Sequence, residues 1–176
     1  VTPSAPQVGT ITQPTCGVAT GSVALSGLPG TGSWTLTRNP GGITTNGSGT
    51  DLLVPGLYPD AYSFRVTNNV GCTSSSSLPV VINLQPVTPA VPVVGTITQP
   101  TCYSATGSVV LSGLPESGTW TLVRSPGGTT TTGTGTVTSV SGVPPGNHTF
   151  VVRNAQGCPS AATAEVRVNS QPTANR

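Results

Sequence analysis

Short runs of alternating apolar and polar residues make up most of this chain. The clearest run covers residues 61–68, where Tyr62, Phe64 and Val66 alternate with polar side chains. A second covers residues 32–38, where Trp34 and Leu36 alternate with threonine. A period of two is typical of β-strands that bury one face, and no segment has the period of an amphipathic helix.

Turn signals rich in glycine and proline separate these runs at intervals of about ten residues. In the first half of the chain the predicted strands are 7–13, 20–25, 32–38, 43–45, 50–54, 61–68 and 79–84. Seven short strands without a helix predict a β-sandwich made of two packed sheets.

The whole pattern occurs twice, with an offset of 86 residues and no insertion or deletion. Val8–Cys16 returns letter for letter as Val94–Cys102, and Trp34-Thr35-Leu36 returns as Trp120-Thr121-Leu122. Exact repetition at a fixed period is the signature of a tandem array. The fold prediction is therefore all-β, with two β-sandwich domains of about seven strands each.

We place the first domain at residues 1–86, with a lead-in at 1–6, and the second at 87–176, with a proline-rich linker at 87–92. Closely spaced prolines favour an extended, semi-rigid connector. Residues 1–6 could also add to the sheet edge of another molecule as a donated strand, and the sequence leaves both roles open.

Residues 57–62 resemble a tyrosine corner, in which a tyrosine near the start of a late strand bonds back to the preceding loop. Tyr62 would supply the hydroxyl. This favours an immunoglobulin- or fibronectin-like sandwich. In the second domain His148 replaces that tyrosine. The corner hydroxyl is therefore lost there, and we expect the His148 ring to be half-exposed.

The four cysteines fall as one pair per domain, Cys16 with Cys72 and Cys102 with Cys158, each pair 56 residues apart. This predicts one disulfide per domain, tying loops at one end of the sandwich, and an oxidising compartment outside the cytosol. A zinc site is the alternative, but two thiolates without a nearby histidine make a poor zinc shell.

Charged residues are scarce. The chain has six arginines, no lysine and four acidic residues, which amount to 6 % of its residues, against about 25 % in ordinary soluble proteins. Nucleic-acid binding requires clustered basic side chains, so it is not expected. No apolar run has the length of a membrane span.

Catalytic chemistry is not expected either. Neither domain repeats the acids of the other, which are Asp51, Asp60, Glu116 and Glu165. A hydrolase needs paired carboxylates, and calcium-stiffened arrays need several per site. His148 has no acid close to it in sequence that would complete a Ser/His/Asp triad. We predict no enzyme activity, no metal and no cofactor.

Three residue types leave alternatives open. Trp34 and Trp120 alternate in phase with leucines and are expected in the core, although exposed they would form stacking platforms for a glycan. Asn46 and Asn147 begin glycosylation sequons at unrelated places in the two domains, which favours chance.

Arg38 and Arg124 recur before equivalent Pro-Gly-Gly turns. They are either solvated strand ends or donors of a repeated hydrogen bond across modules or subunits. The Ser/Thr-rich composition leaves O-glycosylation open as well.

Several motifs occur in both copies in the same order: Gln-Pro-Thr-Cys, Gly-Ser-Val, Gly-Leu-Pro, Gly-x-Trp-Thr-Leu-x-Arg-x-Pro-Gly-Gly and Asn-x-x-Gly-Cys. Together they resemble the tandem repeats of Bacteroidetes surface adhesins, of which the SprB-type gliding-motility adhesins are the best-known case. The resemblance implies a long protein, exported by type IX secretion and displayed as filaments on the cell surface. It supplies no catalytic residues, and the sorting domain of such proteins is absent from this sequence, which implies an internal segment.

The expected function is thus a structural or adhesive repeat of a secreted cell-surface protein, forming a stalk or extracellular filament. Its partners would be further copies or neighbouring repeats, and surface glycans are a further candidate. The alternative is a carbohydrate- or surface-binding accessory module. An exposed tryptophan would favour the alternative, and a buried one would remove its best platform.

Overall fold

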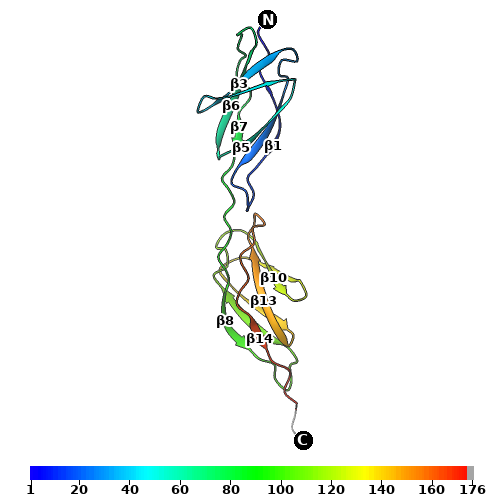
Figure 1. The fold of residues 1–176 in the computed structure, drawn as a ribbon. Helices are drawn as coiled ribbons and strands as arrows, with labels where there is room; N and C mark the ends of the chain where they lie inside the picture. The colour runs from blue at the N-terminus through cyan, green and yellow to red at the C-terminus, as the bar shows by residue number, and fades with distance from the viewer. Residues whose placement is uncertain (174–176) are drawn as a thin grey trace. The chain divides into compact units, whose positions relative to one another are not determined.

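The computed structural model describes residues 1–173. The chain forms two compact units, Val1–Pro86 and Val87–Arg176, which we call module 1 and module 2. The described residues contain fourteen strands and no helix, so the prediction of an all-β fold is confirmed (Figure 1).

Module 1 holds the first seven strands in two antiparallel sheets, ordered β1-β2-β5 and β4-β3-β6-β7. Their bounds are β1 Gln7–Thr12, β2 Gly21–Ser26, β3 Ser33–Asn39, β4 Ile43–Ser48, β5 Leu52–Leu57, β6 Asp60–Asn68 and β7 Val80–Ile82. The fourth strand pairs with the third. In the immunoglobulin constant-type arrangement the fourth strand joins the other sheet, so this module is a variant of that sandwich.

Module 2 repeats this arrangement, with sheets ordered β12-β9-β8 and β11-β10-β13-β14. Its strands are β8 Val93–Thr98, β9 Gly107–Ser112, β10 Trp120–Ser125, β11 Thr129–Gly133, β12 Val137–Val143, β13 Gly146–Arg153 and β14 Val166–Val168. Consecutive strands run in alternating directions through each module, because every pairing is antiparallel and each connection crosses to the neighbouring or facing strand.

Two strands extend beyond their predicted limits. β4 continues through Asn46 and Gly47 to Ser48, and β5 continues through Pro55 and Gly56 to Leu57. Gly56 adopts a φ of +68°, and the pairing register between β2 and β5 shifts beyond Val54. A bulge therefore absorbs the residues that look like a loop in the sequence.

Serine side chains replace part of the last strand's backbone pairing. The Ser74 and Ser77 amides donate to the carbonyls of Val66 and Phe64, and their hydroxyls accept from the amides of those two residues. Both serines are buried. Ser160 and Thr163 make the same bonds to Val152 and Phe150. The predicted strand at 79–84 is accordingly short, and the polar run before it completes the sheet edge.

Each module has its own apolar core between its two sheets. In module 1 the core holds Val23, Leu25, Leu28, Trp34, Leu36, Leu57, Tyr62, Phe64, Val66, Val80 and Ile82. Module 2 has the equivalent set, in which His148 replaces the tyrosine and Val140 is added. The alternating faces read from the sequence are the faces that the structure buries.

Candidate functional sites at the two ends of each module

An asparagine fastens the incoming chain at one end of each module. In module 1, Asn68 Oδ1 accepts from the Cys72 amide (2.9 Å) and Asn68 Nδ2 donates to the Val1 carbonyl (3.0 Å). In module 2, Asn154 Nδ2 donates to the Val87 carbonyl at 2.8 Å. We call this the leading end. The lead-in prolines Pro6 and Pro92 are both buried, so each lead-in packs on its own module.

Two glutamines fasten the outgoing chain at the opposite end. Gln13 Nε2 donates to the Val81 carbonyl (2.9 Å), and its Oε1 accepts from the Asn83 amide (2.8 Å). Gln85 Nε2 donates to the Cys16 carbonyl at 3.2 Å. We call this the trailing end. The module 2 equivalents are Gln99 with Arg167 (3.0 Å), Asn169 with Gln99 (2.8 Å) and Gln171 with Cys102 (3.0 Å).

The two cysteines of a module lie at these opposite ends. β6 begins at the trailing end, where Asp60 pairs with Ile82, and finishes at Asn68 beside Cys72. A strand of nine residues is about 27 Å long. Disulfide geometry requires Cα atoms within about 7 Å. The length of β6 therefore separates Cys16 from Cys72.

The predicted pairs Cys16–Cys72 and Cys102–Cys158 are consequently wrong. Cys72 and Cys102 are free thiols, whereas Cys16 and Cys158 are disulfide-bonded. The presence of a disulfide is shown, but one bridge within each module is not what the structure has. The constant spacing of 56 residues reports the repeat and not the pairing.

Trp34 and Trp120 lie in the cores, 2 % and 1 % exposed. Their indole Nε1 groups donate to the carbonyls of Gly49 and Gly135, both at 2.8 Å. Gly133 leaves room for the indole, because a Cβ there would come within 2.6 Å of the Trp120 ring. The interpretation of these tryptophans as glycan platforms is therefore wrong, since neither ring face is available.

The corner bond is present in both modules. Tyr62 donates its hydroxyl to the Tyr58 carbonyl at 2.9 Å, which confirms the predicted tyrosine corner. The hydroxyl is lost in module 2, but His148 Nε2 makes the corresponding bond to the Pro144 carbonyl at 2.8 Å. His148 is buried, only 4 % exposed, and not half-exposed as predicted. The imidazole nitrogen reaches the same acceptor position as the phenol.

Arg38 packs within its own module. It continues the inward face of β3 after Trp34, and its guanidinium lies over the Tyr62 ring, 5.2 Å from the centroid. Its Nε is buried without a hydrogen-bond partner, as is that of Arg124. Arg124 instead donates from Nη2 to Thr129 Oγ1 at 3.1 Å. The cation–π contact accounts for Arg38 more directly than a solvated strand end does.

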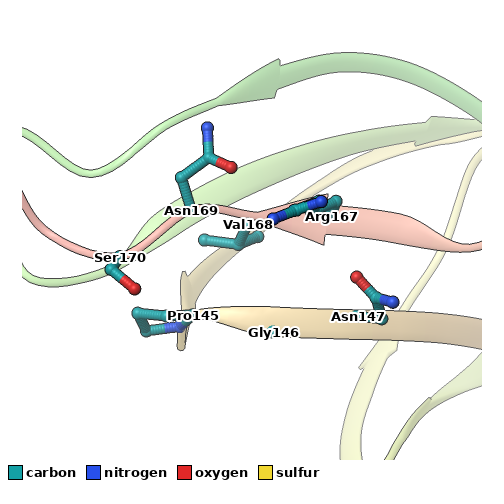
Figure 2. Close-up of a pocket in the computed structure, with 7 residues that line it drawn as sticks. All are labelled: Pro145, Gly146, Asn147, Arg167, Val168, Asn169 and Ser170. Carbon is teal, nitrogen blue, oxygen red and sulfur yellow. The ribbon is translucent and has the colours of Figure 1, made fainter.

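An open hollow of module 2 is lined by the start of β13 and the end of β14 (Figure 2). Asn147 and Arg167 lie on the two paired strands, and Ser170 faces Pro145. Asn147 Nδ2 donates to Glu165 Oε2 at 3.2 Å. One guanidinium with amides and a hydroxyl supplies no pair of a nucleophile and a base, so we assign no catalytic function to this hollow.

Both sequon asparagines are exposed on strands. Asn46 lies on β4, where its Oδ1 accepts from Thr35 Oγ1, and Asn147 lies on β13. Their modification remains a prediction. The four acids stay scattered, and among residues 1–173 no group of three or more histidine, cysteine or acidic side chains could hold a metal ion. Within the same residues no helix is long and apolar enough to cross a membrane.

Comparison with known proteins adds little to this description. No protein-family model and no curated sequence matches the chain. Among solved structures, the human OSCAR ligand-binding domain is similar at 14 % identity and a TM-score of 0.38, covering 96 % of this chain and all of that one. A likeness at this level shows nothing about the role of this chain.

Proposed function

We propose that the chain is a structural and adhesive repeat segment of a secreted bacterial cell-surface protein, which forms a stalk or extracellular filament and has no catalytic role. In this proposal it consists of two tandem immunoglobulin- or fibronectin-like sandwich domains of seven strands. Its partners are neighbouring repeats or further copies of itself. The resemblance to Bacteroidetes adhesin repeats, and with it type IX secretion, belongs to the same proposal.

The observation that carries the proposal is the duplicated fastening of the chain at both module ends. Asn68 and Asn154 each bind the first residue of their module, and Gln85 and Gln171, in the outgoing segments, each bind a cysteine carbonyl between the first two strands of their module. Side chains that fix the backbone where it enters and leaves a domain suit a tandem array, because they hold the connecting segments to the domain.

A second observation supports lateral association. β4 and β11 are outer strands of their sheets, and each pairs on one side only. Their sequences, Ile-Thr-Thr-Asn-Gly-Ser and Thr-Thr-Thr-Thr-Gly, contain no charge and no proline. Soluble proteins usually protect such edges with lysine, proline or a covering element. Uncharged edges suit pairing with another molecule.

Electron microscopy of the non-reduced protein, with light scattering alongside, tests the proposal. We expect continuous filaments whose repeat matches one or two modules. The variant Thr44→Lys places a charge on the β4 edge and should weaken lateral association. Thr37→Lys, on the adjacent position of the inner strand β3, is the matched control and should not. Monomers that persist at high concentration would rule out self-assembly.

The alternative is a carbohydrate- or surface-binding accessory module. The burial of Trp34 and Trp120 removes its best platform and leaves only the loops to bind a glycan.

A further inference from the structure

Each cysteine lies beside the segment through which the chain enters or leaves its module, and one side chain connects the two. At the leading end, Asn68 binds both the Cys72 amide and the Val1 carbonyl. At the trailing end, Gln85 binds the Cys16 carbonyl one residue before the module finishes at Pro86. The cysteines are therefore parts of the module ends.

Equivalent cysteines differ in oxidation state. Cys16 is disulfide-bonded, whereas Cys102, its trailing-end equivalent, is an exposed thiol. Cys158 is disulfide-bonded, whereas Cys72, its leading-end equivalent, is a half-buried thiol. The local hydrogen bonds are the same in both modules. The two oxidised cysteines thus comprise one trailing-end and one leading-end residue, and so do the two free cysteines.

We propose that Cys72 and Cys102 are linkage sites for neighbouring modules of the same sequence type. A trailing-end cysteine of one module bonds to the leading-end cysteine of the module that follows it. Repetition of this bond produces a covalent ladder along an array. The inference rests on the proposed function, because it names the partner of each module end in such an array.

The bond needs an oxidant, and a small-molecule disulfide such as oxidised glutathione supplies it. One protein thiolate attacks this disulfide and releases the first glutathione thiol. The second protein thiolate then attacks the mixed disulfide, so that the protein disulfide forms and a second glutathione thiol leaves. Two protein thiols are oxidised and one glutathione disulfide is reduced.

Chain continuity provides the reach for this bond. If a further module preceded Val1 through the same junction, its equivalent of Gln85 would lie two residues before Val1, within about 7 Å along the backbone. That glutamine would hold the added module's trailing-end cysteine, and Asn68 holds Cys72 beside Val1. Pairing within one module is prevented, because β6 separates the two ends.

The test is to extend the full chain at its N-terminus by a further copy of residues 1–86. The extended protein is equilibrated in a glutathione redox buffer, alkylated without reduction and mapped by mass spectrometry. We expect Cys72 to become protected and to appear in a peptide linked to the added copy's equivalent of Cys16. In the original chain Cys72 should remain alkylated. The extended Cys72→Ser variant should expose one additional thiol, which lies in the added copy.

Alkylation of Cys72 in the folded extended chain would overturn the inference, and so would a disulfide between the two cysteines of the added copy. A second measurement separates this inference from the proposed function. Filaments formed by the double variant Cys72→Ser, Cys102→Ser would show that assembly does not need the bond, and the ladder would then be judged by peptide mapping alone. A mapped ladder without filaments would instead reject self-assembly and retain the inference.

Discussion

Modules 1 and 2 make the same corner hydrogen bond with different side chains. Tyr62 and His148 differ in size, polarity and ring chemistry, yet each donates to the carbonyl four residues earlier, at 2.9 and 2.8 Å. Both modules thus place a hydrogen-bond donor on a buried ring at this point, although the two residues differ.

The two modules differ more at their ends than in their cores. The asparagine and glutamine bonds are duplicated, but the cysteines that they hold are oxidised at one end of each module and reduced at the other. Sequence identity between repeats therefore fixes the local structure but not the covalent state. Substitutions at equivalent positions test whether the two modules are also equivalent in stability.

The largest effect is expected from the core tryptophans. Trp34→Ala and Trp120→Ala should each lower the free energy of unfolding of their own module by about 3–5 kcal/mol, through lost burial and the cavity that remains. Hydrogen exchange followed by peptide mass spectrometry would report each module separately. Equal losses confined to the altered module would confirm equivalent cores. Faster exchange of both modules would show that they unfold as one cooperative unit.

A smaller effect is expected at the leading ends. Asn68→Ala and Asn154→Ala each remove an acceptor and a donor and should cost about 1–3 kcal/mol. Asn68→Asp is the matched control, because it keeps the Oδ acceptor for the Cys72 amide and loses only the bond to the Val1 carbonyl. Chemical denaturation should rank it between wild type and Asn68→Ala. If Asn68→Asp were as unstable as Asn68→Ala, the bond to Val1 would account for the whole loss.

Much of the fold follows from sequence patterns. The alternation around Phe64 predicts β6, and the phase of Trp34 with Leu36 predicts its burial. The long β5 was missed because Pro55-Gly56 looks like a turn, and Gly56 instead forms a bulge. The buried serines Ser74 and Ser77 were missed because a serine run looks like a loop. Their spacing of three gives little warning that hydroxyls complete a sheet edge.

The order of the strands contains the information that excludes the predicted cysteine pairs, whereas the spacing of the cysteines does not. Strands that alternate in direction finish at alternate ends of a sandwich. Cys16 follows the first strand and Cys72 follows the sixth, so the two lie at opposite ends. Counting strands between cysteines would have excluded the intramodule bridge. The local motifs around Cys16 and Cys102 are the same, as are those around Cys72 and Cys158, so they do not show which cysteine of each two is oxidised.

Substitutions of Tyr62 and His148 test how much the hydrogen-bond donor at the corner contributes to stability. Tyr62→Phe should destabilise module 1 by about 1 kcal/mol, because the hydroxyl is lost while the ring remains. In module 2, His148→Tyr and His148→Phe share the same ring and differ only in that hydroxyl. We expect His148→Tyr to be more stable by a similar amount in urea denaturation. Equal stability of the two variants would mean that the Pro144 carbonyl obtains its partner elsewhere.

The smallest expected effect concerns the arginine beside the corner. The Arg38 guanidinium lies over the Tyr62 ring, and such a contact contributes about 0.5–1 kcal/mol at partly exposed sites. A double-mutant cycle with Arg38→Met and Tyr62→His isolates that coupling, because methionine retains much of the apolar stem and histidine reproduces the corner of module 2. We expect a coupling of that size in module 1. The reciprocal cycle, Arg124→Met with His148→Tyr, should create a coupling in module 2 if geometry alone sets the contact. Coupling in module 1 alone would show that the bond from Arg124 to Thr129 holds its guanidinium away from the ring, and the modules would then differ in more than the corner residue.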